Sequence, residues 1–92
     1  MGAILGVGKG SERPPRILIV RYNGGPQDAA PIVFAGKGIT FDSGGISIKS
    51  NDGMWAMKTD MTGAAVVMGA VSSLAKSRAP VNVIAIAALA EN

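Results

Sequence analysis

The chain of 92 residues contains no cysteine and no histidine. These absences exclude a disulfide framework and the zinc sites that are built from Cys and His. Any metal ion must therefore be held by oxygen ligands or by an unusual amine. Charged residues are also scarce, at 16% against 48% hydrophobic residues, and the mean hydropathy is +0.33. So apolar a composition indicates surface that further chain or a partner covers.

Clusters of basic residues are missing too, although the net charge is +3. Without a cluster of arginines and aromatic residues, the sequence does not favour nucleic-acid binding. Residues 1–7 are too short and uncharged for a secretory signal, and no apolar run approaches the roughly 20 residues that span a membrane. We therefore expect a soluble, cytoplasmic protein with no membrane partner.

Three apolar runs predict β-strands near residues 17–22, 32–36 and 81–89. Between the last two, apolar residues recur at spacings of three and four, which predicts a helix near 60–77. The glycines and prolines of residues 6–16 predict a loop. The last strand is so apolar that we expect both of its faces to be covered. The order strand, helix, strand predicts a βαβ unit with parallel strands, and thus an α/β fold.

A glycine-rich segment, residues 36–53, follows the second predicted strand. Such glycine density predicts a backbone that turns tightly or approaches another group closely. We expect Phe41, Ile46 and Ile48 to anchor the segment as buried apolar residues. Ligands of parallel sheets gather at the carboxyl ends of the strands. The position and the composition of the segment therefore predict a binding site there.

Four of the ionisable residues in or just after this segment stand out by their positions: Lys37, Asp42, Lys49 and Asp60. Two carboxylates and an amine, brought together by a loop and a helix start, could hold Mg²⁺, Mn²⁺ or Zn²⁺. A lysine binds a metal only as the neutral amine, so the metal must displace a proton from a group with a pKa of about 10.4.

Each of these residues also has an ordinary structural interpretation. Asp60 fits a helix N-cap, and Asp42 fits a turn residue. Lys37 could bind a phosphate or be solvated, and Lys49 alternates with isoleucines as an exposed strand residue does. Nucleotide binding is not favoured, because Lys37 is followed by glycine instead of the Ser or Thr of a phosphate loop, and residues 6–11 lack the dinucleotide spacing. Taken singly, the residues leave the choice open.

The run from Val33 to Lys49, VFAGKGITFDSGGISIK, resembles the signature of the cytosolic leucyl aminopeptidase family of metallopeptidases. The likeness continues through MKTDMTGAA at 57–65 and AEN at 90–92, and GKGS at 8–11 with Pro14-Pro15 also fits. It covers nearly the whole chain. The resemblance implies that residues 1–92 are an internal part of a three-layer α/β/α catalytic domain, with no second domain.

The resemblance also implies roles for individual residues. The residues matching Lys37, Asp42 and Asp60 are metal ligands in the family, and the first aspartate bridges two divalent metals, Mn or Zn. The residue matching Lys49 turns its ammonium to the substrate carbonyl, where it stabilises the oxyanion, while the metals lower the pKa of a shared water. The residue matching Met57 lines the pocket for the first side chain, although Met57 could also fill a core.

The implied activity is that of a hydrolase, an aminopeptidase that releases N-terminal residues, preferably leucine-like, from peptides with a free amino terminus. The family forms hexamers, so a homo-oligomer is expected. The remaining family ligands lie in a downstream Asn-Thr-Asp-Ala-Glu-Gly-Arg motif that these 92 residues lack, and Glu91 does not match it. We therefore expect the isolated chain to bind at most one metal weakly and to be inactive.

A metal-free structural or interaction module derived from the same fold is the alternative. The missing motif and the surplus apolar surface favour the module. Retention of Lys37, Asp42, Lys49 and Asp60 favours the enzyme.

Overall fold

The structure is a computed structural model that describes residues 2–92. Its centre is a three-stranded mixed sheet in the order β1-β3-β2. The strands are β1 Arg16–Asn23, β2 Ile32–Phe41 and β3 Asn82–Glu91. β3 pairs in antiparallel fashion with β1 and in parallel with β2. The parallel pairing of β2 with β3 confirms the predicted relation between these two strands.

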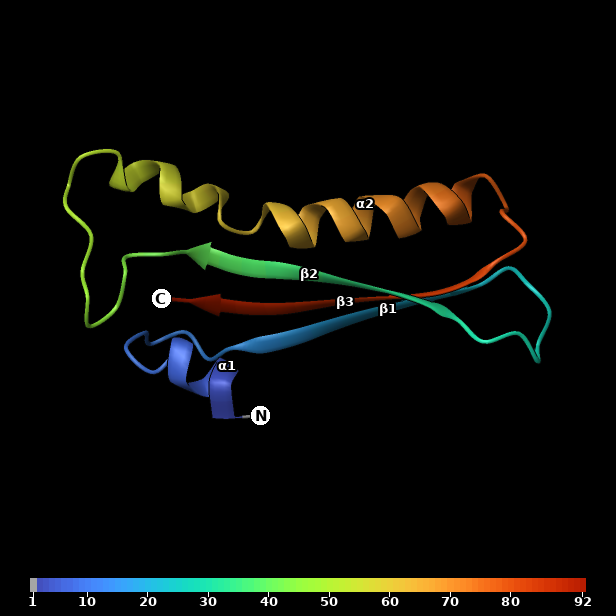
Figure 1. Cartoon of the computed structure of the whole chain (residues 1–92), viewed down its shortest axis with the longest axis horizontal. Helices are drawn as coiled ribbons and strands as arrows, with labels where there is room; N and C mark the ends of the chain where they lie inside the picture. Colours follow the sequence, from blue (N-terminus) through green and yellow to red (C-terminus); the bar gives the residue numbers. More distant parts are fainter. Residues whose placement is uncertain (1) are drawn as a thin grey trace.

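Three helical segments accompany the sheet: α1 Gly2–Val7, the 3-10 helix η1 Met54–Thr59 and α2 Thr62–Lys76. α2 and η1 run along one side of the molecule, and α1 lies on the other side near one end of the sheet (Figure 1). α2 connects the parallel strands β2 and β3, so the predicted βαβ unit and α/β fold are confirmed.

The hydrophobic core lies between α2 and the sheet. Val83 and Ala85 of β3 are fully buried, and Val71 of α2 is 2% exposed. Burying a valine side chain in this way contributes about 1.5–3 kcal/mol. Six partly buried residues surround this centre: Tyr22, Phe34, Val67, Met68, Leu74 and Val81.

The other face of the sheet is largely bare, because within residues 2–92 only α1 approaches it, near one end (Figure 1). The expectation that both faces of β3 are covered is therefore met on one face only. Large apolar side chains on this face remain exposed, among them Ile19 at 61% and Val33 at 56%. This exposure agrees with the surplus apolar surface that the composition indicates.

β2 is longer than predicted, since it continues through Lys37 to Phe41 instead of ending at residue 36. The pairing with β3 carries on, with Lys37 opposite Ala88 and Ile39 opposite Ala90. Gly36 and Gly38 face α2; a Cβ atom on Gly36 would meet helix backbone atoms, and one on Gly38 would first meet Leu89 and Ala88 of β3. These two glycines therefore serve close packing within a strand, and the expectation that Lys37 lies beyond the strand is wrong.

The helix boundary also differs from the prediction of a helix over 60–77. A 3-10 turn precedes α2, whose N-cap is Met61 with no side-chain capping bond. Asp60 instead follows η1, where its backbone N–H donates to the Met57 carbonyl oxygen at 3.2 Å. The N-cap interpretation of Asp60 is therefore wrong, and its carboxylate is directed to another partner.

Three smaller expectations also fail. The first part of the predicted loop 6–16 belongs to α1, which periodicity over six residues could not reveal. Ile46 and Ile48 are 108% and 73% exposed, so neither is a buried anchor, while Phe41 is half-buried. Lys49 lies in a loop and not in a strand. Within residues 2–92, no helix is both long and apolar enough to cross a membrane.

Candidate metal and substrate site

The first element of the site is an ion pair between a strand and a helix junction. Lys37 Nζ on β2 lies 2.8 Å from Asp60 Oδ2, between η1 and α2. The contact with Asp60 raises the pKa of Lys37 above its usual range, against a smaller opposing effect of burial, and Asp42 adds a further electrostatic contribution. Because the Lys37 side chain is 61% exposed, this pair is largely open to solvent screening.

Asp60 presents an unusual carboxylate oxygen. Its Oδ2 atom is buried and has no hydrogen-bond donor aligned with it, although Lys37 Nζ is within ion-pair distance. The pair therefore has the distance of a hydrogen bond without its direction. Buried polar atoms are normally satisfied, and an exception in a native fold calls for a partner such as water or an ion. This oxygen is suited to bind a metal cation.

The second element is the turn that follows β2. Asp42 Oδ1 accepts a hydrogen bond from the Gly44 backbone N–H at 3.0 Å, and Asp42 Oδ2 accepts one from Lys49 Nζ at 2.7 Å. Gly44 and Gly45 have φ angles of 99° and 70°, which favour glycine. The hydrogen bond from Lys49, helped by that from Gly44, holds the pKa of Asp42 below its usual value. Asp42 thus also has the turn role that its sequence context indicates.

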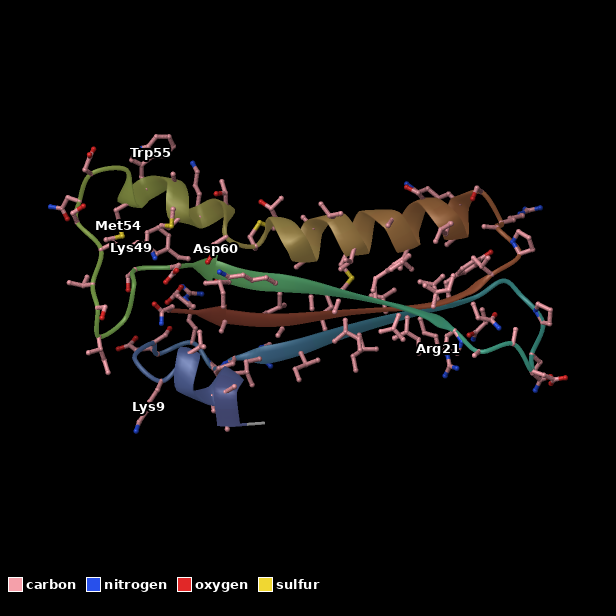
Figure 2. All side chains as sticks on the ribbon, viewed as in Figure 1. Lys9, Arg21, Lys49, Met54, Trp55 and Asp60 are labelled. Atoms are coloured by element: carbon pink, nitrogen blue, oxygen red, sulfur yellow. The ribbon has the colours of Figure 1, made fainter. Side chains whose placement is uncertain are left out.

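The two pairs lie near the same end of β2. Asp42 and Lys37 interact electrostatically, each favouring the charged form of the other. Figure 2 shows Lys49 and Asp60 near η1, at the end of the sheet where β2 finishes. The structure therefore brings together the four ionisable residues that the sequence singles out, as two ammonium–carboxylate pairs.

The donor set limits how a metal could bind here. Among residues 2–92, no three His, Cys, Asp or Glu side chains gather as a metal-binding group. A lysine amine would have to complete a site that uses Asp42 and Asp60. Carboxylate oxygens with an amine suit Mn²⁺ and Zn²⁺, and the unsatisfied Asp60 oxygen offers one such ligand. The residues present therefore fit part of a divalent-metal site, provided that Lys37 gives up its proton.

An apolar hollow of about 620 Å³ opens beside Lys37 and Asp42. Most of its wall comes from three residues of α1 and three of the sheet: Ala3, Ile4, Val7, Ile39, Ala88 and Ala90. Met57 does not line this hollow. It lies half-buried on η1, three residues before Asp60.

Trp55 on η1 is 71% exposed and points away from the sheet (Figure 2). Lys58 Nζ lies 5.5 Å from the centroid of the Trp55 ring. Exposed cation–π contacts of this kind stabilise weakly, by about 0.5–1 kcal/mol. Lys58 therefore belongs to a surface contact and takes no part in the two ion pairs.

The small residues at the start of α2, Gly63, Ala64 and Ala65, indicate a helix that can sit close to the sheet, but its partner in β2, Gly36, was not predicted. A Cβ atom on Gly36 would lie 2.6 Å from the Gly63 carbonyl carbon and 2.8 Å from the Ala64 amide nitrogen. This approach brings the η1–α2 junction, and with it Asp60, over β2. A glycine in a strand together with a glycine in the first turn of the next helix is the signal that could have predicted it.

Charged side chains gathered where a parallel strand of a βαβ unit ends are typical of α/β proteins that bind their ligands at this edge of the sheet. Residues 1–92 match the catalytic domain of the Cytosol aminopeptidase family along their whole length. The chain belongs to this family.

Relatives and solved structures agree with this assignment. Probable cytosol aminopeptidases of Gluconobacter oxydans and Wolbachia pipientis are 58% and 50% identical over 91 and 92 residues. The chain spans 18% of the length of each relative. A cytosol aminopeptidase structure from Coxiella burnetii matches 98% of the chain and 19% of its own length, with 37% identity and a TM-score of 0.89. The bottromycin maturation enzyme BotP in complex with Mn matches 97% of the chain and 19% of its own length, with 40% identity and a TM-score of 0.84.

Proposed function

We propose that residues 1–92 form part of the catalytic domain of a metal-dependent aminopeptidase and supply part of its metal site. Lys37, Asp42 and Asp60 are the proposed ligands of divalent metal ions. The observation that carries the proposal is the buried Asp60 Oδ2, which has no aligned hydrogen-bond donor and faces Lys37 Nζ at 2.8 Å. Such an oxygen is better satisfied by a metal ion than by the poorly directed ammonium group of Lys37.

Lys49 has a different proposed role, because it does not belong to the ligand set. Its ammonium is held 2.7 Å from Asp42 Oδ2, so a positive charge is fixed at the edge of the site. There it stabilises the oxyanion that develops when the peptide carbonyl is attacked. Bound divalent metals supply an activated water and polarise the carbonyl. Lys49 adds an electrostatic contribution of the chain's own.

The proposed substrates are peptides with a free amino terminus and a leucine-like first residue. Met57, half-buried on η1 close to Asp60, is proposed to line the pocket for that side chain. Mn²⁺ and Zn²⁺ are the proposed metals, and BotP is a relative that has been described with Mn. We further propose that the whole protein works in the cytoplasm as a homo-oligomer, a hexamer.

The 92 residues are proposed to need further ligands before they can act. At the proposed site they offer two carboxylates and one amine, whereas each of two metals needs a set of ligands of its own. Relatives are more than five times as long, since the chain spans 18% of their length, and the missing ligands are proposed to lie outside residues 1–92. On its own, the chain should therefore bind at most one metal, weakly, and should lack activity.

Chelation followed by metal return tests the proposal in the full-length protein. Removing metal should abolish hydrolysis of a leucine anilide, and added Mn²⁺ or Zn²⁺ should restore it. Blocking the α-amino group of the substrate should also prevent cleavage. Turnover that survives complete chelation, or that accepts the blocked substrate equally well, would contradict the proposed function.

A further inference from the structure

The turn that carries Asp42 is held by a residue far away in the sequence. The Asn92 backbone N–H donates to the Phe41 carbonyl oxygen at 2.9 Å, and the Ser43 N–H donates to the Asn92 carbonyl oxygen at 3.0 Å. Phe41 and Ser43 are the two neighbours of Asp42. The backbone of Asp42 is therefore clamped on both sides by the residue that follows β3.

The Asn92 side chain makes a second connection. Its Nδ2 atom donates to the Val7 carbonyl oxygen at the end of α1, at 3.0 Å. The same amide packs against the turn, because a Cβ atom on Gly45 would lie 3.1 Å from Asn92 Nδ2. Asn92 thus lies between α1 and the Asp42–Gly45 turn and touches both.

Glu91 holds the next part of the same N-terminal segment. Its Oε1 accepts a hydrogen bond from Ser11 Oγ at 2.8 Å, and its Oε2 lies 3.7 Å from Arg13 Nε. The segment that begins with α1 is therefore attached to the end of β3 at two successive residues. Because these attachments lie beside the turn, the Asn92 amide can transmit movement of this segment to Asp42.

We propose that Asn92 is a positioning residue, whose side-chain amide ties α1 to the turn and so fixes the Asp42 carboxylate in the orientation a metal requires. This inference rests on the proposed role of Asp42 as a ligand. Groups that orient metal ligands without touching the metal typically change affinity or activity 10- to 100-fold when removed. The backbone hydrogen bonds of Asn92 do not need its side chain, so replacing that side chain with alanine or aspartate isolates the contribution of the amide.

The test compares three variants of the full-length protein. Asn92→Ala removes the amide, and Asn92→Asp keeps its size but replaces the Nδ2 donor to Val7. Asn51→Ala is the matched control, at an exposed loop asparagine. We expect both Asn92 variants to bind Mn²⁺ about 10- to 100-fold more weakly than the unmodified protein. With saturating Co²⁺, their visible absorption bands should also shift, while the unfolding temperature and the control change little.

The cobalt spectrum separates positioning from a general contribution to stability, because stability alone would move the unfolding temperature and leave the bands in place. Unchanged Mn²⁺ affinity and unchanged cobalt bands in both variants would overturn the proposal. Failure of both variants to fold would also overturn it, since the amide would then support the whole fold. If the unmodified protein binds no Mn²⁺, the proposed function itself fails, which is a distinct result.

Discussion

Gly36 of β2 and Gly63 of α2 are in direct backbone contact, so close that no side chain fits between them. A Cβ atom on Gly63 would in turn lie 2.9 Å from the Lys37 amide nitrogen. The contact sets the height of α2 above the sheet at the point where Asp60 approaches Lys37. Backbone packing by two glycines and the 2.8 Å ion pair are therefore parts of one arrangement.

Gly36→Ala should destabilise the protein, because its new Cβ atom would meet backbone atoms of Gly63 and Ala64 that no rotamer change can move. Overpacking of this kind costs about 1–3 kcal/mol. Gly69→Ala on α2 is the control, since nothing lies within 4 Å of its added Cβ atom. It should raise stability by about 0.5–1 kcal/mol, because alanine favours the helix. Urea unfolding of both variants checks the difference, and equal midpoints would contradict the close contact.

Lys49→Ala in the full-length protein should lower kcat by about 10²–10³, the effect of removing one group that stabilises an oxyanion. Its metal content should fall far less than its turnover, because Lys49 contacts the Asp42 carboxylate but is not itself a proposed ligand. Lys58→Ala is the matched control, because Lys58 contacts the exposed Trp55 ring. Kinetics and metal analysis of the two variants check this. A Lys49→Ala protein that loses metal yet keeps its turnover would show that the role is wrong.

Asp60→Asn should weaken Mn²⁺ binding by more than about tenfold, since even groups outside the ligand set have effects of that size. The metal-free protein should unfold at nearly the same temperature, because Asp60 does not cap α2 and its partner Lys37 is largely exposed. Asp52→Asn, on the exposed loop, is the control. Calorimetry measures both quantities. A large loss of stability with intact metal affinity would restore a purely structural role for Asp60.

The isolated 92-residue chain should not hydrolyse a leucine anilide with added Mn²⁺ or Zn²⁺. Two carboxylates and one amine cannot complete a two-metal site, and Lys49, 38% exposed, would act in water where its charge has little effect. Exposed apolar residues such as Ile19 should also promote association. Steady turnover by chain that is free of any longer aminopeptidase would contradict this expectation.

The regular part of the fold could be predicted from local patterns. The unbroken apolar runs of β1 and β3 indicate buried strands by their length and the turn residues beside them, and the spacing along α2 reveals the helical period. The parallel pairing of β2 and β3 follows from the helix between them. β2 was predicted too short because Gly36 and Gly38 are typical of turns, whereas here Gly36 admits the neighbouring helix and Gly38 admits the Leu89 side chain of β3. Only the packing partner distinguishes these two uses of glycine.

The residues that gather at the candidate site could be predicted, but not the way in which they pair. Sequence spacing placed Asp60 at a helix start, where a capping role is the ordinary interpretation. The intervening 3-10 turn moves the cap to Met61 and turns the carboxylate toward Lys37. That turn depends on tertiary contacts between η1 and β2, which a local pattern does not record. The tie between Asn92 and Val7 joins residues 85 positions apart and has no local signature either.

Anomalous diffraction from crystals of the full-length protein soaked in Mn²⁺ tests most directly whether Lys37, Asp42 and Asp60 hold metal together. We expect metal peaks at the end of β2, with Lys37 Nζ and oxygen atoms of Asp42 and Asp60 each about 2.0–2.3 Å from a peak and Asp42 touching two of them. Manganese bound elsewhere, with Lys37 still paired to Asp60 and Lys49 alone on Asp42, would contradict the proposed ligand set.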